Sequence, residues 1–486
     1  MSTIPRCMST QHPDNAMVPF FATSSVLAGE DEIREAYYAY SHLGCDEQMW
    51  DVEGKEIDEH VVKKLLTFYP EYFCGHVLGE DLRLTLRVPN PLVEKAEAKI
   101  LLETLESIPR SHDVASLFYR REVTPIFEVI LPMTVSARCI DRVYRYYVNY
   151  VIGRQHMRLG DGDITIAEWI GEFAPSRIGV IPLLEDVPTM IRAAEIMEEY
   201  LADKDFSDQR VFLARSDTAM NYGLVSAALA NKIALARLEE LSVRIGVRLH
   251  PIIGLGSAPF RGGLAPPTVE RVGKEYPSVV TFTIQSAFKF DYPAHEVRAA
   301  CEYLRAREIG PAQPVDTERA LTIIERYSAA YRQQVVELAP YINHIAKFVP
   351  GRRARKLHIG LFGYARELNG VTLPRAISFV CALYSLGLPP ELIAFDVLTG
   401  EDLAFVKQVY PSFQEEIATA LAFTDFEGPF MTPSLRNALE RAGFSFSQHP
   451  EHLDLVRKIR SSLEQNNGAQ LTDLITRAAI LRRFLG

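Results

Sequence analysis

Short apolar runs alternate with long amphipathic stretches in the middle third of the chain. The runs lie at 178–186, 211–217, 247–256 and 279–285, and each is rich in β-branched residues and contains a polar group. Between them, apolar residues recur at the three- and four-residue spacing of an amphipathic helix. This alternation predicts consecutive βα units, and therefore a parallel sheet whose strands are buried on both faces.

The polar groups of these four runs recur at nearly constant intervals. They are Glu185, Asp217, His250 and Gln285, which are 32, 33 and 35 residues apart. A TIM barrel of about 250 residues uses roughly 31 residues for each of its eight βα units. A doubly wound sheet would also bury its strands, but polar groups at successive strand ends favour the barrel, because barrel enzymes place their chemistry there. We therefore predict an α/β fold, a TIM (β/α)8 barrel with additional peripheral and C-terminal helices.

Further elements extend the pattern on both sides. Candidate strands lie at 82–90, 127–134 and 357–363. The stretch 221–246 predicts a long helix that ends at Gly246, a residue suited to a helix C-cap. These elements fit one barrel with covering helices.

The chain has no low-complexity linker that would separate domains. We expect one domain over residues 1–486, with the barrel and its active-site rim residues at roughly 80–375. The remaining part, roughly 375–486, has a mainly helical pattern and is expected to pack as extra helices around the barrel.

Composition narrows the classes of function. The chain has 52 Lys and Arg against 62 Asp and Glu, and these charges are mixed along its length. Without a basic block, neither nucleic acid nor an anionic membrane is an expected partner. The N-terminus lacks the apolar core of a signal peptide, and no stretch approaches the ~20 apolar residues of a membrane span. The six scattered cysteines suggest neither zinc nor disulfides, so we expect a cytoplasmic protein.

Two carboxylates at successive predicted strand ends are candidate metal ligands. Glu185 and Asp217 would be neighbours on a barrel rim, and oxygen ligands without sulfur suit Mg²⁺, with Mn²⁺ as the alternative. Asp217 precedes a helix and could instead be only its N-cap. The same alternative is weaker for Glu185, because Asp186 follows it and can cap the helix itself.

Arginines near glycine turns and strand ends could bind an anionic substrate. In the segment GLGSAPFRGGLAPP at 254–267, the glycines allow a ligand close to the backbone, and Arg261 offers a planar fork for phosphate or carboxylate oxygens. A solvated turn with one arginine would have the same pattern. The other arginines in comparable places are Arg87, Arg215, Arg366 and Arg375.

Two histidines are candidates for proton transfer. His12 lies in the segment STQHPDN, near a terminus, where a histidine is commonly exposed and idle. His250 lies within a predicted strand, where a histidine satisfied within the core is the commoner case. The residues together predict a barrel enzyme with a divalent metal and an anionic substrate, and they leave the reaction open.

Several segments, in the same order, resemble the archaeal-type phosphoenolpyruvate carboxylases. The N-terminal MSTQHPDN looks like the start of that type, and its His-Pro pair resembles the TAHPTE segment of the longer bacterial and plant enzymes. This resemblance implies that His12 is the catalytic histidine. VIPLLED and ARSDTAMNYG resemble VPLFET and GYSDSxKDxG, which implies that Glu185 and Asp217 are the metal ligands.

Later segments extend the resemblance to the substrate-binding residues. LHPIIGLGSAPFRGG is similar to FHGRGGSIGRGG, which implies catalytic roles for His250 and Arg261. The segments TIQSAFKF, LTLRVPN, LHIGLFGYAR and LPRAISFVCALYSLG resemble TEQGE, LDIRQ, NIGSRPAKR and LRAIPWIFAWTQ, which implies that Gln285, Arg87, Arg366 and Arg375 bind substrate.

The chain also departs from the longer enzymes. Met220 stands where they have a lysine, and Leu255 stands where they have the second arginine of the glycine loop. We expect Arg215 to supply the missing positive charge. The QNTG ending of the longer enzymes is absent, so the resemblance carries no expectation of their feedback and acetyl-CoA control.

The resemblance implies a homotetrameric enzyme that uses Mg²⁺, or Mn²⁺, to join bicarbonate to phosphoenolpyruvate, giving oxaloacetate for the tricarboxylic acid cycle and phosphate. One alternative is another Mg²⁺-dependent barrel for phosphoenolpyruvate or pyruvate, a carbon–carbon lyase or a phosphomutase, which would not depend on bicarbonate. A barrel used as a scaffold is a second alternative. It is disfavoured because a scaffold has no need of His12, Glu185, Asp217 and Arg261 together.

Overall fold

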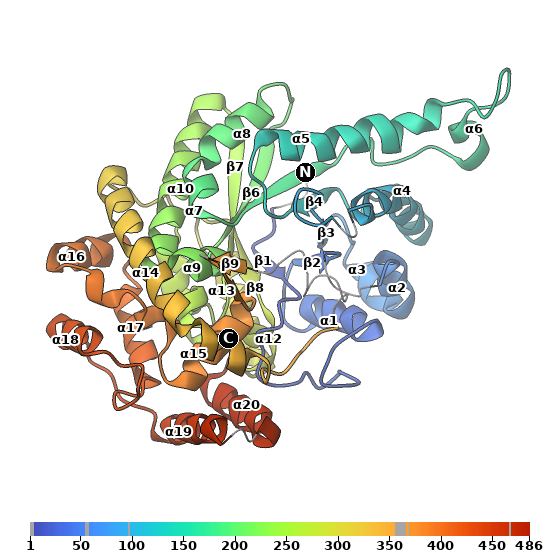
Figure 1. The fold of residues 1–486 in the computed structure, drawn as a ribbon. Coiled ribbons are helices and arrows are strands. Elements are labelled where there is room, and N and C mark those ends of the chain that lie inside the picture. The colour runs from blue at the N-terminus through green and yellow to red at the C-terminus, as the bar shows by residue number, and fades with distance from the viewer. Residues whose placement is uncertain (1–3, 54–57, 96–97, 355–365, 369, 466–467) are drawn as a thin grey trace.

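Eight parallel strands close into a barrel in the computed structural model of the chain (Figure 1). The structure describes residues 4–53, 58–95, 98–354, 366–368, 370–465 and 468–486. The barrel strands are β1 (Cys7–Ser9), β2 (Glu47–Asp51), β3 (Arg83–Arg87), β4 (Glu128–Leu131), β5 (Gly179–Leu184), β6 (Asp208–Ala214), β7 (Arg248–Gly254) and β8 (Thr281–Ile284). Each strand pairs in parallel with its neighbours, and β8 closes the barrel on β1. The predicted TIM barrel is confirmed.

The barrel begins earlier in the chain than the sequence pattern indicated. Strands β3 to β8 coincide with predicted runs, although β6 begins three residues before its run, at Asp208. Strands β1 and β2 were not predicted, so the barrel starts at Cys7 and not near residue 80. Its last strand ends at Ile284, well before residue 375. The predicted strand at 357–363 lies outside the described residues. The order β1 to β8 therefore follows the chain without interruption.

Ion pairs inside the barrel explain why β2 has no apolar pattern. Glu47, the first residue of β2, is fully buried and lies 2.6 Å from the guanidinium of Arg210 in β6. Arg210 also contacts Glu128 at 3.2 Å, and Glu128 pairs with Arg83 at 2.8 Å. Buried charges need such partners, because an isolated ion pays a large desolvation penalty. Hydrophobic periodicity cannot reveal a strand whose inward residues are charged.

Helices surround the barrel and follow most of its strands (Figure 1). Up to the end of the barrel and just beyond it they are α1 (Glu30–Ser41), α2 (Val61–Phe68), α3 (Pro70–Gly75), α4 (Ile100–Tyr119), α5 (Ala137–Tyr146), η1 (Tyr147–Ile152), η2 (Gly153–His156), α6 (Ile166–Ile170), α7 (Val187–Ile191), α8 (Ala193–Leu201), α9 (Ser216–Tyr222), α10 (Leu224–Ile245), η3 (Pro259–Arg261), η4 (Pro266–Thr268), α11 (Val269–Glu275), α12 (Ser286–Phe290), α13 (Ala294–Ala306) and α14 (Thr317–Ala346). The predicted C-cap at Gly246 is confirmed, with φ 71°.

The long helix predicted over 221–246 is broken at Gly223, which separates α9 from α10. Gly223 has φ 84° and ψ 166°, a backbone conformation essentially restricted to glycine. A β-carbon at this position would lie 2.5 Å from the ring of Tyr327 and 2.9 Å from that of Tyr331. The break therefore ends the short helix α9, which follows β6, before the long helix α10 begins.

The part of the chain after α14 is mainly helical, as the sequence predicted. It contains a two-stranded sheet of β9 (Arg366–Leu368) and β10 (Val371–Leu373), followed by α15 (Ala376–Leu386), η6 (Pro390–Leu392), η7 (Phe395–Val397), α16 (Gly400–Val409), α17 (Phe413–Ala422), α18 (Pro433–Ala442), α19 (Pro450–Glu464), η8 (Gly468–Gln470) and α20 (Leu471–Arg482). Buried apolar side chains of these helices and of the barrel form one continuous cluster.

None of the described helices is, by itself, both long and apolar enough to cross a membrane. The pair Ala376–Leu386 and Pro390–Val397 meets those criteria when taken together, with a bend of 86° between its members.

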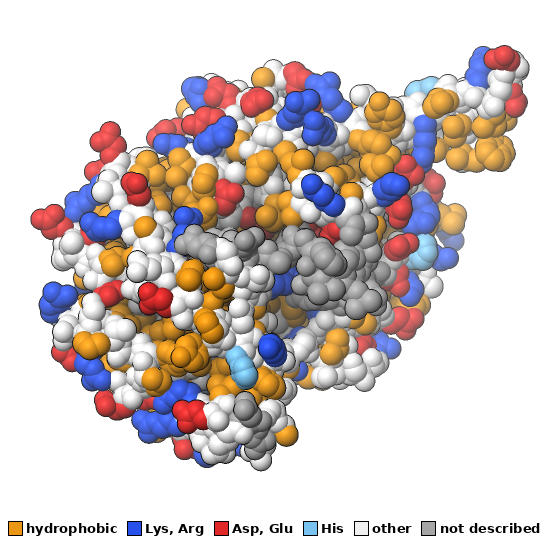
Figure 2. Space-filling model, in the orientation of Figure 1, with side chains coloured by type: hydrophobic (Ala, Val, Ile, Leu, Met, Phe, Trp, Pro, Cys, Tyr) orange, Lys and Arg blue, Asp and Glu red, His pale blue; other side chains and the backbone are white. Residues whose placement is uncertain are grey.

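An arm built from α5, η1, η2 and α6 extends away from the barrel (Figure 1). Figure 2 shows hydrophobic side chains gathered near the end of this arm. Tyr150, Met157 and Trp169 are 66%, 61% and 65% exposed, and α6 has no buried residue. These three exposed side chains and those of α6 therefore do not belong to the barrel core.

Candidate active site

A cavity of about 870 Å³ opens at the carboxyl ends of the barrel strands. Every strand contributes a lining residue, either its last residue or one of the next three in the chain: His12, Asp51, Arg87, Met133, Glu185, Asp217, Gly254 and Gln285. Barrel enzymes bind their substrates at this end of the strands. The cavity is therefore the candidate active site.

The cavity unites most of the residues that the sequence singled out. Seven of them line it together: His12, Arg87, Glu185, Asp217, Arg261, Gln285 and Arg375. The glycine loop after β7 brings in Arg261, and the start of α15 brings in Arg375. The cavity therefore combines two candidate metal ligands, a histidine and several arginines from segments far apart in the sequence.

The structure does not bring His250 to this cavity. His250 is the third residue of β7, and the strand continues to Gly254 before it reaches the cavity. Its imidazole Nε2 lies 2.8 Å from Asp208 Oδ1, at the start of β6. The predicted place of His250 on the rim is therefore wrong, because the polar group of this run marks the beginning of the strand and not its end.

Arg215 also lies outside the cavity lining. It follows β6 directly, is fully buried, and its guanidinium donates to the carbonyl of Phe260 at 3.4 Å and to the hydroxyl of Tyr410 at 3.2 Å. It therefore joins the glycine loop to the C-terminal helices and does not replace the lysine missing at Met220. Arg366 begins β9, where it pairs with Leu373 of β10, outside the barrel.

The two candidate metal ligands follow adjacent strands, β5 and β6, which pair directly. The backbone N–H of Met133 donates to Glu185 Oε2 at 2.6 Å and holds that carboxylate at the cavity wall. Asp186 caps α7 by accepting from the backbone N–H of Thr189 at 2.7 Å, as the sequence predicted. Asp217 is the second residue of α9 and not its N-cap, so its capping alternative is wrong.

These carboxylates fit a magnesium ion held by few protein ligands. Within the described part of the chain, no group of three or more His, Cys, Asp or Glu side chains is arranged to hold a metal. Mg²⁺ usually takes only one or two protein carboxylates and completes its shell with water and substrate oxygens. Two oxygen donors on the wall of an open cavity match that preference. A structural zinc site, in contrast, is closed by four protein ligands.

Arg87 lies close to three carboxylates. Its guanidinium pairs with Asp51 at 2.9 Å and with Glu53 at 2.7 Å. Burial favours a lower pKa for Arg87, but the charges of Glu53, Asp51 and Glu185 outweigh it and raise that pKa. Burial raises the pKa of Glu53 to about 8, although Arg87 opposes the rise. Arg87 therefore stays positively charged beside Asp51 and Glu53.

Burial and a neighbouring cation both disfavour the charge of Arg375. Burial lowers its pKa, and repulsion from Arg87 lowers it further, while Glu53, Asp51 and Glu185 oppose this. An anion bound in the cavity would relieve the repulsion between the two arginines. The cavity is thus suited electrostatically to an anionic substrate.

Arg261 is held by four protein acceptors. It donates to Ser216 Oγ at 3.2 Å, Asp14 Oδ2 at 3.0 Å, Gln285 Oε1 at 2.5 Å and the main-chain oxygen of Gly486 at 2.6 Å. Asp14 is fully buried and also accepts from the backbone of α12. A guanidinium held at this many points presents a fixed positive charge at the cavity wall.

The glycine loop must lack a side chain at Gly256 for Arg261 to lie there. A β-carbon on Gly256 would be 2.7 Å from the guanidinium carbon of Arg261. The backbone N–H of Gly256 donates to the carbonyl of Arg261 at 2.9 Å, which closes the loop on itself. The glycine is required by this close approach.

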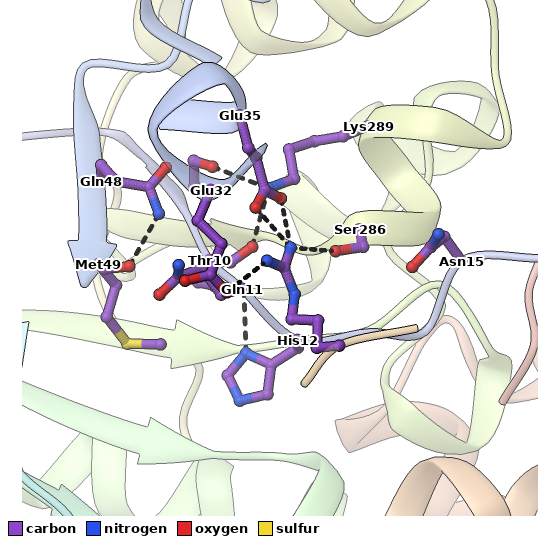
Figure 3. A network of polar contacts seen from close by, with 12 residues as sticks. Thr10, Gln11, His12, Asn15, Glu32, Glu35, Gln48, Met49, Ser286 and Lys289 are labelled. Carbon is purple, nitrogen blue, oxygen red and sulfur yellow. Dashed lines mark hydrogen bonds and ion pairs between the residues drawn. The ribbon is translucent and has the colours of Figure 1, made fainter. Parts of the chain in front are cut away.

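His12 follows the short strand β1 and lines the cavity, although it lies near the N-terminus. Its Nδ1 lies 2.9 Å from Thr10 Oγ1 (Figure 3). The backbone N–H groups of Asp14 and Ser286 both donate to the His12 carbonyl, at 3.0 and 3.2 Å. These contacts fix the residue at the cavity wall.

A family model described as phosphoenolpyruvate carboxylase matches residues 4–486. The chain belongs to the phosphoenolpyruvate carboxylase family. Proteins with that name from Methanothermobacter thermautotrophicus and Methanospirillum hungatei are 55% and 53% identical to the chain, each over 99% of the chain and 100% of the relative. The protein of that name from Halobacterium salinarum is 49% identical over the full length of both. The resemblance to archaeal-type carboxylases is confirmed, and the chain is an enzyme.

Sequence reasoning missed two cavity residues of this carboxylase family member, Arg352 and Arg353. The guanidinium of Arg353 contacts Glu35 at 2.5 Å and Glu32 at 3.1 Å, both buried on α1. Arg352 donates to the carbonyls of Asn15, at 3.2 Å, and Ala16, at 2.6 Å. The basic run GRRAR is typical of a solvated surface. Acidic residues facing inward on α1 could have indicated Arg353, whereas the backbone partners of Arg352 leave no signal in the sequence.

Proposed function

We propose that the chain carboxylates phosphoenolpyruvate with bicarbonate to give oxaloacetate and phosphate. Membership of the family, with relatives of that name along the whole chain, supports the reaction. The observation that carries the proposal is the convergence of His12, Arg87, Glu185, Asp217 and Arg261 on one cavity. A proton-transfer group, fixed cations and two oxygen ligands are what such a reaction requires.

The proposed reaction has two stages. A bicarbonate oxygen attacks the phosphorus of phosphoenolpyruvate, and the bond from phosphorus to the enol oxygen breaks, which gives carboxyphosphate and the enolate of pyruvate. Carboxyphosphate then divides into carbon dioxide and phosphate, and the methylene carbon of the enolate attacks carbon dioxide. Negative charge accumulates at both stages, so the site must offer fixed positive charge.

The arginines would supply this charge in different ways. Arg261 has its guanidinium held by four protein acceptors, which allows it to stabilise the transferring phosphoryl oxygens without reorganising. Arg87 and Arg375 repel one another in the absence of an anion. We therefore propose that these two bind the substrate, together with Gln285, which lines the cavity and orients Arg261.

Mg²⁺, or Mn²⁺ in its place, would be held by Glu185 and Asp217 and would act as a Lewis acid toward substrate oxygens. Met133 would orient the first of these ligands through its backbone N–H. The position of Asp217 on the first turn of α9 supports a ligand role, because the residue does not cap the helix.

His12 would accept and donate protons while carboxyphosphate decomposes. We expect His12→Asn to keep cleaving phosphoenolpyruvate but to release pyruvate in place of much of the oxaloacetate, because decarboxylation and capture by the enolate lose their proton carrier. The measurement is the ratio of oxaloacetate to pyruvate, each quantified enzymatically. An unchanged ratio would remove His12 from the mechanism.

The same assay separates the alternatives. A carbon–carbon lyase or a phosphomutase would share the carboxylate pair but would turn over equally well without bicarbonate. A scaffold would bind neither Mg²⁺ nor phosphoenolpyruvate. Loss of all turnover when bicarbonate is removed therefore favours the carboxylase over each of them.

We further propose that the enzyme is a homotetramer that works in the cytoplasm and replenishes the tricarboxylic acid cycle with oxaloacetate. The arm with exposed Tyr150, Met157 and Trp169 supports assembly, because apolar side chains gathered on a projecting element mark a contact surface. Size-exclusion chromatography with light scattering tests the tetramer, and a monomer at micromolar concentration would contradict it.

A further inference from the structure

We infer that Thr10 is a positioning residue for His12, which holds Nδ1 of the imidazole at its hydroxyl and so assigns proton exchange in the cavity to Nε2. The inference rests on the proposed role of His12. It concerns the ring nitrogens, which the two stages of the reaction do not by themselves distinguish.

The contact between the two side chains is direct. Thr10 Oγ1 lies 2.9 Å from His12 Nδ1, and Thr10 is completely buried (Figure 3). Proton exchange at Nε2 leaves the other proton on Nδ1 in both the neutral ring and the imidazolium, so Nδ1 donates to the Thr10 hydroxyl, which can accept. The bond therefore persists while the imidazole gains and loses a proton at Nε2, on the opposite edge of the ring.

The backbone of Thr10 is held on both sides, which fixes where its hydroxyl can lie. The N–H of Thr10 donates to the carbonyl of Ile284, at the end of β8, at 3.0 Å. The carbonyl of Thr10 accepts from Lys289 Nζ at 2.8 Å. Thr10 thus continues the pairing of β1 with β8 by one residue and is tied down by α12.

Lys289, which holds the carbonyl of Thr10, uses all of its hydrogen-bond donors. Its Nζ donates to Ser9 Oγ at 3.0 Å and to Glu35 Oε1 at 2.7 Å, besides the carbonyl of Thr10. An ammonium has three donors, and all three are used. Burial favours a higher pKa for Glu35, but Arg353 and Lys289 outweigh it and lower that pKa, so the anchor of Lys289 is an ionised carboxylate.

A continuous set of contacts thus links Arg353 at the cavity wall to the imidazole. It passes through Glu35, Lys289 and Thr10 to His12, over hydrogen bonds that Figure 3 draws from close by. The backbone contacts of His12 fix where the residue lies but not how its ring is turned. The bond from Thr10 is the contact in this set that sets the rotation of the ring.

The test compares Thr10→Val with Thr10→Ser, in the wild-type and His12→Asn backgrounds. Valine keeps the shape of threonine and removes the hydroxyl, whereas serine keeps the hydroxyl. The measurement is the ratio of oxaloacetate to pyruvate formed from phosphoenolpyruvate, bicarbonate and Mg²⁺ between pH 6 and 9. We expect Thr10→Val to lower the ratio roughly 3- to 10-fold, the range that one hydrogen bond supplies, and Thr10→Ser to stay within about twofold of wild type.

In the His12→Asn background, Thr10→Val should lower the ratio no further, since the two residues act as one unit. Equal losses in both backgrounds would overturn the inference, because Thr10 would then act through another group. A wild-type ratio in Thr10→Val together with a low ratio in His12→Asn would overturn it as well, while leaving the proposed role of His12 intact. A wild-type ratio in His12→Asn would refute the role of His12, and the inference with it.

A spectroscopic measurement covers the case in which Thr10→Val does not fold. The wild-type enzyme is labelled with ¹⁵N-histidine, and the His12 signals are assigned by their absence in His12→Asn. We expect a single neutral tautomer at this residue, the one with its proton on Nδ1, and a neutral ring with its proton on Nε2 would overturn the inference. Averaged nitrogen shifts from two exchanging tautomers would overturn the inference.

Discussion

Replacing Gly223 by alanine should damage both the stability and the active site of the enzyme. Gly223 separates α9, which carries Asp217, from α10. Its φ of 84° and ψ of 166° suit glycine alone, and the added β-carbon would lie 2.5 Å from the buried ring of Tyr327. The chain cannot relieve this contact by a rotamer change, because the fixed ring and the backbone both oppose it.

The cost follows from two contributions. A non-glycine residue in this part of the backbone map costs about 1–3 kcal/mol. Overpacking of a close-packed interior by one carbon costs about 1–3 kcal/mol. We therefore expect the free energy of unfolding to fall by about 2–6 kcal/mol, a large part of the roughly 5–15 kcal/mol typical of a folded protein.

The assay is urea denaturation followed by circular dichroism, together with turnover under native conditions. Gly400→Ala is the matched control: this glycine is exposed at the first position of α16, and a β-carbon there would meet no atom within 4 Å. We expect the control to lie within about 0.5 kcal/mol of wild type. A Gly223→Ala variant as stable and active as that control would refute the reasoning.

Two further predictions concern the metal and acid stability. Asp217→Asn should raise the Mg²⁺ concentration for half-maximal activity at least about tenfold, because an amide is a much weaker ligand than a carboxylate. The control Asp186→Asn, which changes a helix cap, should not raise it. Equal Mg²⁺ titrations of the two variants would contradict the assignment of Asp217 as a ligand. Burial, aided by Arg482, lowers the pKa of His452 to about 2. The unfolded chain, with its ordinary histidine pKa near 6.5, therefore takes up a proton that the native protein does not as the pH falls from 6.5 to 5, which costs the native state about 2 kcal/mol. His452→Gln should lose that part of the acid dependence in urea denaturation at pH 6.5 and 5, and a slope equal to that of wild type would contradict it.

The sequence revealed the barrel wherever its strands are apolar. Strands β5, β6 and β8 end close to the polar groups that the alternation marked, so Glu185, Asp217 and Gln285 were placed correctly at the cavity. The spacing argument worked there because these polar residues follow the last apolar residue of a strand.

The same argument failed where a polar residue occupies another part of a strand. His250 lies at the beginning of β7, where it meets Asp208, and β2 carries an inward-facing Glu47 whose partner, Arg210, is 163 residues away. The structure of β1 was also hidden, because three residues give too little pattern. Ion pairs between distant charges and the position of His12 after β1 arise only when the barrel closes. The local periodicity of the sequence therefore cannot predict them.

The arginines illustrate the same limit. Arg87, Arg261 and Arg375 lie at the cavity, whereas Arg215 lies outside its lining and donates to the glycine loop at Phe260. All four nevertheless lie near predicted strand ends or glycine turns in the sequence. Which way a side chain turns depends on partners such as Tyr410, which comes from a helical part of the chain far from the barrel strands.

The central claim is tested most directly by measuring the products formed from phosphoenolpyruvate and Mg²⁺ with and without bicarbonate. Oxaloacetate is followed through malate dehydrogenase and NADH, and phosphate is measured in the same samples. We predict that oxaloacetate and phosphate appear in equal amounts and only when bicarbonate is present. Turnover of phosphoenolpyruvate by the folded enzyme that is indifferent to bicarbonate, or no turnover at all, would contradict the account.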